Sequence, residues 1–153
     1  MTRLIAIATA GHAGLLGGAF LFQLAGYAPC AMCLWQRWPH AAAILLGVLA
    51  LAGIAPRLMA LGGALAAATT SAIGAYHAGV EQDWWEGPSA CSGGGGLGGL
   101  TGGDLLSTDI PETLVLCDEI VWQLGLTMAG WNMVLSAGLA VIWVLAARRA
   151  SAV

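Results

Sequence analysis

Four cysteines supply the reactive side chains of this sequence, and they occur as two pairs. Cys30 and Cys33 form a Cys-x-x-Cys motif, whereas Cys91 and Cys117 lie much further along the chain. Two thiols at the first spacing can close a small disulfide ring, and a thiolate can attack a disulfide or donate electrons to an acceptor. The pattern therefore predicts thiol–disulfide chemistry. Four cysteines allow three pairings, and the spacing alone does not choose among them.

Two other uses of four cysteines compete with redox chemistry. Static disulfides could brace a loop, and four thiolates could bind zinc. Zinc ribbons use two Cys-x-x-Cys pairs, whereas Cys91 and Cys117 are separated by a long stretch whose first part, residues 92–103, is rich in glycine. We therefore expect no metal site.

A single cation stands beside the first pair. Arg37 follows Cys33 by four residues, about one turn if a helix begins near Cys33. A helix N-terminus and a nearby cation each lower the pKa of a thiol and so favour the reactive thiolate. A bracing disulfide has no need of a cation, so Arg37 favours the reactive interpretation over the static one.

The elements that must hold these cysteines are apolar helices. The chain has 153 residues, of which 59% are hydrophobic and only 8% are charged, far fewer charges than the roughly 25% of soluble domains. Four apolar runs approach or exceed the length that crosses a hydrocarbon core, and backbone groups in lipid must bond within their own segment. The sequence predicts an all-α, integral membrane four-helix bundle of one domain, with helices at about 4–26, 38–55, 58–79 and 126–147.

Charge predicts how this bundle is oriented. Arg3, Arg57 and the Arg148–Arg149 pair fall on one side of the four helices, and all eight acidic residues lie between Glu81 and Glu119 on the other. The positive-inside rule makes the arginine side cytoplasmic. We therefore expect both termini in the cytoplasm, and all four cysteines and the long loop at about 80–125 outside. The net charge of −3 gives no reason to expect a nucleic-acid partner.

Small and polar residues inside the apolar runs predict helix contacts. Gly14 and Gly18 have the spacing that lets two helix backbones approach closely in lipid. His12 lies in the middle of the first run, where an ionisable side chain is a functional candidate by default. We expect it to be a neutral imidazole that hydrogen-bonds a neighbouring helix.

Three separated motifs resemble the DsbB family of bacterial membrane quinone:thiol oxidoreductases. Residues 29–37, Pro-Cys-Ala-Met-Cys-Leu-Trp-Gln-Arg, are similar to the family's Pro-Cys-x-x-Cys-x-x-Gln-Arg signature. Residues 76–91 resemble the exit from its third helix and its first loop cysteine, and residues 117–131 resemble its second loop cysteine and the start of its fourth helix. The motifs occur in the family's order and span its four-helix layout.

The resemblance implies a location and an electron route. It implies a multi-pass protein of the bacterial inner membrane with its cysteines in the periplasm. A soluble periplasmic thiol oxidase of the DsbA type would reduce a Cys91–Cys117 disulfide, and Cys117 and Cys30 would exchange. Cys33 would lie beside a membrane quinone, ubiquinone or menaquinone, and donate electrons to it.

Four residues are candidates for the quinone site. Arg37 matches the family's quinone-site arginine, and His77 matches a nearby site residue. Gln36 lies within the signature and is a candidate for orienting the loop or the quinone. For Glu81, a role in quinone protonation competes with that of a solvated loop carboxylate, and for His77 the alternative is a histidine at the membrane interface.

Two rival functions remain beside this one. A vitamin K epoxide reductase-like enzyme would also couple thiols to a quinone in four helices, but there the Cys-x-x-Cys follows the loop pair, and here the order is reversed. A membrane subunit without enzyme activity, with disulfides that only brace an outer loop, would not need Arg37.

Overall fold

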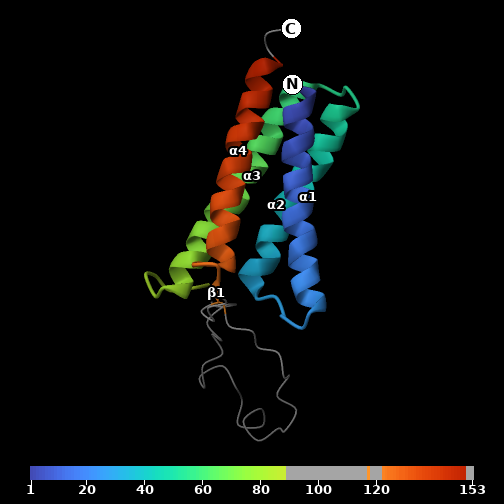
Figure 1. The fold of residues 1–153 in the computed structure, drawn as a ribbon. Helices are drawn as coiled ribbons and strands as arrows, with labels where there is room; N and C mark the ends of the chain where they lie inside the picture. The colour runs from blue at the N-terminus through green and yellow to red at the C-terminus, as the bar shows by residue number, and fades with distance from the viewer. Residues whose placement is uncertain (89–116, 118–121, 151–153) are drawn as a thin grey trace, which may run out of the picture.

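The structure is a computed structural model that describes residues 1–88, 117 and 122–150. Four helices run alternately up and down, and a two-stranded hairpin precedes the last of them (Figure 1). The elements are α1 (Thr2–Leu24), α2 (Ala31–Leu51), α3 (Pro56–Glu81), β1 (Trp122–Gln123), β2 (Leu126–Thr127) and α4 (Met128–Arg149). Consecutive helices pack together and α4 closes the bundle against α1. The predicted all-α four-helix fold is confirmed; the small hairpin was not predicted.

The second helix begins seven residues before its predicted start. A proline next to this predicted start, Pro39, is a local signal against helix, but it lies inside α2. Cys30 is the N-cap, and its Sγ accepts a hydrogen bond from the Cys33 backbone N–H at 3.2 Å. A proline within a helix removes one backbone hydrogen bond, while the longer helix buries side chains at four-residue spacing on one face. These side chains are Met32, Gln36 and His40.

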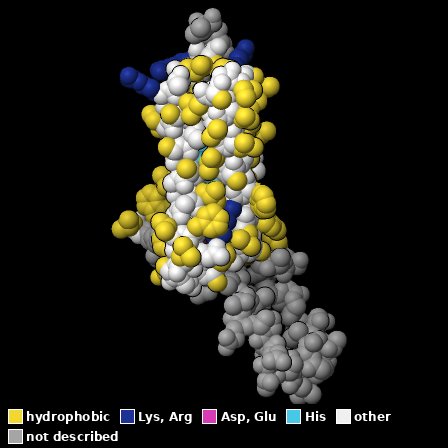
Figure 2. Space-filling model, turned by 90° about the vertical axis from the view of Figure 1, so that its right-hand side faces the viewer, with side chains coloured by type: hydrophobic (Ala, Val, Ile, Leu, Met, Phe, Trp, Pro, Cys, Tyr) yellow, Lys and Arg dark blue, Asp and Glu magenta, His cyan; other side chains and the backbone are white. Residues whose placement is uncertain are grey.

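The bundle has the surface of a membrane protein. Of the described helices, α1, α3 and α4 are long and apolar enough to cross a membrane. Large apolar side chains point outward, including Leu24 (84% exposed) and Leu65 (70% exposed). Figure 2 shows hydrophobic side chains along the whole length of the bundle, most of the visible basic side chains at one end, and a further basic group nearer the other end. α2 differs because Gln36, Arg37 and His40 crowd its first half.

The two ends of the bundle are chemically different. Both termini lie at the same end (Figure 1), together with the starts of α1 and α3 and the end of α4, which carry Arg3, Arg57 and the Arg148–Arg149 pair. Cys30 begins α2 at the opposite end. Which side of the membrane each end faces stays a prediction.

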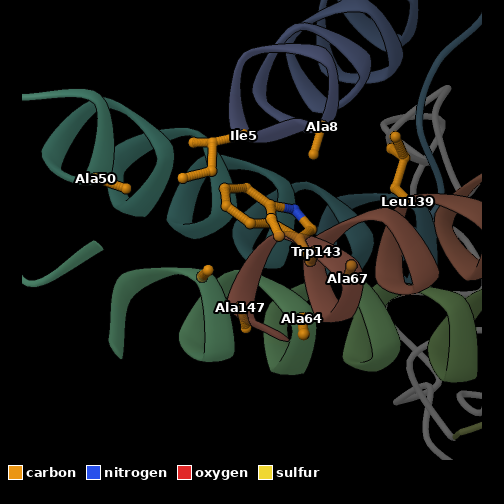
Figure 3. Packing of buried hydrophobic residues seen from close by; sticks show 10 residues of the cluster. Ile5, Ala8, Ala50, Ala64, Ala67, Leu139, Trp143 and Ala147 are labelled. Atoms are coloured by element: carbon orange, nitrogen blue, oxygen red, sulfur yellow. The ribbon is translucent and has the colours of Figure 1, made fainter. Parts of the chain in front are cut away.

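One tryptophan forms the centre of the packing at the arginine end. The Trp143 side chain is fully buried among small residues from all four helices, with Ile5, Ala8, Ala50, Ala64 and Ala67 around it (Figure 3). A Cβ built on Gly63 would lie 2.7 Å from the Trp143 ring, so the absence of a side chain there lets α3 and α4 approach. Gly14 and Gly18 behave differently from the prediction: nothing lies within 4 Å of a Cβ built on either.

The turns next to the helix ends need unusual backbone conformations. Ala55 has φ 37° immediately before Pro56, which occupies the first turn of α3 and suits that position because its missing N–H has no partner there anyway. Leu124 and Gly125 both have positive φ between β1 and β2, as expected for the tight turn of a two-residue hairpin. The hairpin leads directly into Thr127, whose hydroxyl caps α4 by accepting from the Gly130 N–H at 3.0 Å.

Candidate active site

The Cys-x-x-Cys pair sits at the start of α2 as two thiols. The Sγ atoms of Cys30 and Cys33 lie 2.8 Å apart, with Cys30 donating to Cys33. This hydrogen bond, with burial of the sulfur, raises the pKa of the Cys30 thiol above its usual value. Cys30 is buried and Cys33 is half-buried. The geometry therefore keeps the proton on Cys30 and favours negative charge on Cys33.

Cys117 lies beside this pair although it is 87 positions from Cys30 in the chain. The sulfurs of Cys30 and Cys117 and a ring nitrogen of His77 all lie within 4.8 Å of one another, and all three residues are buried. Cys117 is disulfide-bonded, whereas Cys30 and Cys33 are free. Cys91, the fourth predicted site residue, lies outside the described residues. The two cysteine pairs that the sequence separates thus meet at Cys30 and Cys117.

The same three residues have the spacing of metal ligands. Cysteine sulfur and histidine nitrogen are ligands that zinc prefers, and the three atoms are close enough to share an ion. A metal needs thiolates, however, and the Cys117 sulfur is committed to a disulfide in this state. The arrangement suits sulfur exchange better than coordination.

A cavity of about 690 Å³ opens next to the dithiol and is lined by residues of all four helices. Its walls are mostly apolar, as in typical sites for small organic molecules. Gly14 and Gly18 line it, so these glycines widen a cavity instead of drawing two helices together. All six described candidates from the sequence also line it: Cys30, Cys33, Gln36, Arg37, His77 and Glu81.

Arg37 is held at the wall of this cavity by α1. Its Nη1 donates to Gln23 Oε1 at 2.7 Å and its Nη2 to the Ala19 carbonyl at 3.4 Å. The guanidinium carbon also lies 4.8 Å from the centre of the Phe20 ring, within the range of a cation–π contact. Its Nε is buried and has no protein partner among the described residues. Arg37 thus places a fixed positive charge at a mostly apolar cavity.

His77 joins the dithiol to the other candidates. Its Nε2 lies 3.6 Å from Cys30 Sγ and 3.9 Å from Glu81 Oε1, and its Nδ1 lies 3.0 Å from Gln36 Nε2. His77 and Glu81 are both buried, which contradicts the alternative of a solvated loop carboxylate for Glu81. The Oε2 atom of Glu81 has no described hydrogen-bond partner.

Sequence reasoning missed the polar residues behind the site. Asn132 of α4 donates to Gln36 Oε1 at 2.6 Å, and its Oδ1 lies 2.8 Å from His40 Nε2. His40 in turn lies 2.7 Å from His12, Nδ1 to Nδ1, which confirms the expected bond from His12 to a neighbouring helix. The signal that could have found them was the same as for His12, since any strongly polar residue inside an apolar span needs a partner.

Known proteins place the chain in one family. The family model described as "Disulfide bond formation protein DsbB" matches residues 1–146. The "Disulfide bond formation protein B" of Albidiferax ferrireducens is 32% identical over 97% of this chain and 91% of its own length. The "Disulfide bond formation protein B 2" of Pseudomonas aeruginosa strain PAO1 is 33% identical over 80% of this chain and 77% of its own. No solved structure matches significantly. The chain therefore belongs to the DsbB family of disulfide bond formation membrane proteins.

Proposed function

We propose that this protein oxidises a soluble periplasmic dithiol protein of the DsbA type and passes the electrons to a membrane quinone. The observation that supports this most is the meeting of Cys117 with Cys30, whose sulfurs lie within 4.8 Å of each other beside the cavity. Two cysteines that only braced a loop would gain nothing from lying next to a second, reduced pair.

The exchange proceeds by thiolate attack on disulfide sulfur. The partner's thiolate attacks Cys91 and releases Cys117, which attacks Cys30 of the Cys30–Cys33 disulfide and releases Cys33. The partner's second thiol closes the partner's disulfide and releases Cys91. Cys91 then attacks Cys117, reforms the loop disulfide and releases Cys30. Two electrons and two protons have then moved from the partner to the Cys30–Cys33 pair. The exchange ends with the loop disulfide restored and with Cys30 and Cys33 as thiols.

The cavity residues suit a quinone as the final acceptor. A bound quinone supplies an acceptor for two electrons and two protons. Arg37 lines the cavity, so its guanidinium would hold a quinone oxygen, and its charge would stabilise negative charge there. Cys33 carries the electrons to the cavity, and Cys30 supports its thiolate by hydrogen bonding. His77 and Glu81 line the same cavity and can hold protons.

The serial scheme is tested by separating its two halves. Cys117→Ser should abolish oxidation of a reduced DsbA-type protein, because no sulfur then reaches Cys30 from the loop. In the same variant, a small dithiol should still reduce Cys30–Cys33, and added ubiquinone or menaquinone should reoxidise it. Cys91→Ser should behave in the same way. Partner oxidation at the unmodified rate in either variant would contradict the scheme, and Cys33→Ser, which should fail in both assays, is the matched control.

A further inference from the structure

A hydrogen-bonded chain of side chains, all buried except the half-buried Asn132, runs from the dithiol into the middle of the bundle. It starts at Cys30, continues through His77, Gln36 and Asn132, and ends at the His40–His12 pair. Every helix contributes: α1 by His12, α2 by Gln36 and His40, α3 by His77, and α4 by Asn132. His77 has a role in the quinone site proposed above, whereas Asn132, His40 and His12 have no assigned role, although Asn132 and His40 also line the cavity.

The direction of each hydrogen bond is determined by the two amides. The Asn132 NH2 faces Gln36 Oε1 and the Thr70 carbonyl, and its Oδ1 faces His40 Nε2 and the Ser136 hydroxyl. Reversing this amide would place its oxygen against two acceptors, so the orientation is fixed.

Gln36 is fixed by the same reasoning. Its Oε1 accepts from Asn132, so its NH2 faces the Met32 carbonyl at 3.3 Å and His77 Nδ1 at 3.0 Å. An amide NH2 only donates, so His77 Nδ1 must accept and carries no proton. A neutral His77 therefore carries its proton on Nε2. Nε2 lies 3.6 Å from the Cys30 sulfur and 3.9 Å from Glu81 Oε1, which are both acceptors, and the His77 ring also hydrogen-bonds the Cys117 backbone.

The far end of the chain obeys the same rule. His40 Nε2 must donate to Asn132 Oδ1, which leaves His40 Nδ1 free to accept from His12 Nδ1–H. His12 Nε2 then carries no proton, and that atom is buried without a described partner. Three neutral imidazoles and two amides thus satisfy one consistent set of bonds.

We propose that Asn132, His40 and His12 are positioning residues for His77, and that their hydrogen bonds hold its proton on Nε2, facing Cys30. A histidine is commonly oriented in this way by the partner of its other ring nitrogen. The Nε2–H donates to the Cys30 sulfur when Cys91 attacks Cys117 and Cys30 leaves as a thiolate. The opposite tautomer would present a lone pair to that thiolate and oppose its departure.

An alternative role for the same hydrogen-bonded side chains would be to conduct protons between Cys30 and His12. Gln36 and Asn132 interrupt such a path, since an amide NH2 would have to lose a proton and its carbonyl gain one. The chain also ends at a buried His12 Nε2 with no described hydrogen-bond partner. The geometry therefore favours orientation over proton transfer.

The test uses the full protein in detergent with ring-labelled histidine, whose nitrogen NMR shifts distinguish the two tautomers. The protein has three histidines, so the signals that are missing in His77→Phe identify those of His77. We expect unmodified His77 to be the Nε2–H tautomer and Asn132→Leu to convert it to a mixture. Partner oxidation should fall about tenfold in Asn132→Leu, the lower end of what is lost with groups that orient a functional histidine.

Ser71→Ala is the matched control. Ser71 also joins α3 to α4, by a hydrogen bond to the Met133 carbonyl at 2.9 Å, but it does not belong to the hydrogen-bonded series of side chains. It should change neither readout. Either an Nδ1–H tautomer of His77 in the unmodified protein or a single Nε2–H tautomer in Asn132→Leu would overturn the proposal. If Asn132→Leu does not accumulate in cells, His40→Leu interrupts the hydrogen-bonded chain one residue further from His77. The tautomer of His77 in the unmodified protein and in His40→Leu then tests the proposal in the same way. The role of the tautomer in partner oxidation rests on the proposed function, but the tautomer measured by NMR does not. If the unmodified protein showed no quinone-dependent turnover, the proposed function would be refuted and the assignment of the His77 tautomer would stand.

Discussion

Arg37 shows how a single side chain can be prepared for an acceptor. Two of its nitrogens are bonded to α1, through Gln23 and the Ala19 carbonyl, and the aromatic ring of Phe20 packs against the guanidinium. These contacts hold the charge in place before anything binds, so little reorganisation is needed when negative charge develops nearby. They also join the two helices that form opposite walls of the cavity.

Replacing Arg37 should therefore affect turnover more than folding. We expect Arg37→Ala to lower kcat/KM for quinone about a hundredfold, the range found when one stabilising donor is removed. Arg37→Lys should be intermediate, because lysine keeps the charge but not the planar set of donors. Steady-state kinetics at matched expression measures this. Arg148→Ala, at the other end of the bundle, is the control, and equal kcat/KM in Arg37→Ala and the unmodified protein would reject the site.

The raised pKa of Cys30 gives a second prediction. Its first cause is the hydrogen bond to Cys33, and burial adds to it. A raised pKa means that Cys30 remains a thiol at pH values where an ordinary cysteine has begun to ionise. Cys33→Ala removes the first cause, so the pKa of Cys30 should fall while burial keeps it above the ordinary value.

Thiolate absorbance and alkylation of Cys30 against pH, followed by peptide mass spectrometry, measure this shift. The Cys30 ionisation midpoint should lie at lower pH in Cys33→Ala than in the reduced unmodified protein. A midpoint that is unchanged or higher would show that burial, not the neighbouring thiol, sets the value.

At the scale of the helices, the contact between α3 and α4 depends on the missing side chain at Gly63. A methyl group there would lie 2.7 Å from the Trp143 ring, which is fully buried and cannot move into solvent. We expect Gly63→Ala to destabilise the protein by about 1–3 kcal/mol, as overpacking does. Thermal unfolding in detergent measures this. Gly138→Ala, on α4 with nothing within 4 Å of the added methyl, should be neutral or slightly stabilising.

The helices could be predicted because apolar backbone in lipid has few alternatives, and the helix bounds mostly agree to within two or three residues. The start of α2 could not, because Pro39 is a local signal for a break, and only burial of Gln36 and His40 against other helices outweighs it. The cysteines, Arg37 and His77 were found because a motif marks them. Asn132 has no motif, and its role depends on which residues three other helices bring to it.

At the scale of the whole molecule, the separation of charges predicts the orientation. With native cysteines replaced by serine, a single cysteine introduced by Gln82→Cys, just beyond α3, should react with an impermeant maleimide in intact cells. One introduced by Arg57→Cys, at the opposite end of α3, should react only after the membrane is permeabilised. Labelling of position 57 but not position 82 in intact cells would show that the orientation in the membrane is the reverse of the predicted one.

The polar chain through all four helices has a consequence for biosynthesis. A ribosome delivers α1 first, and its mid-span His12 has no partner until α2 brings His40. Asn132, which connects that pair to Gln36 and His77, belongs to the last helix made. A nascent chain that still lacks α4 therefore carries the Cys30–Cys33 pair without the hydrogen bonds that orient His77 beside it. The proposed electron transfer should therefore reach its full rate only after α4 has been translated and inserted.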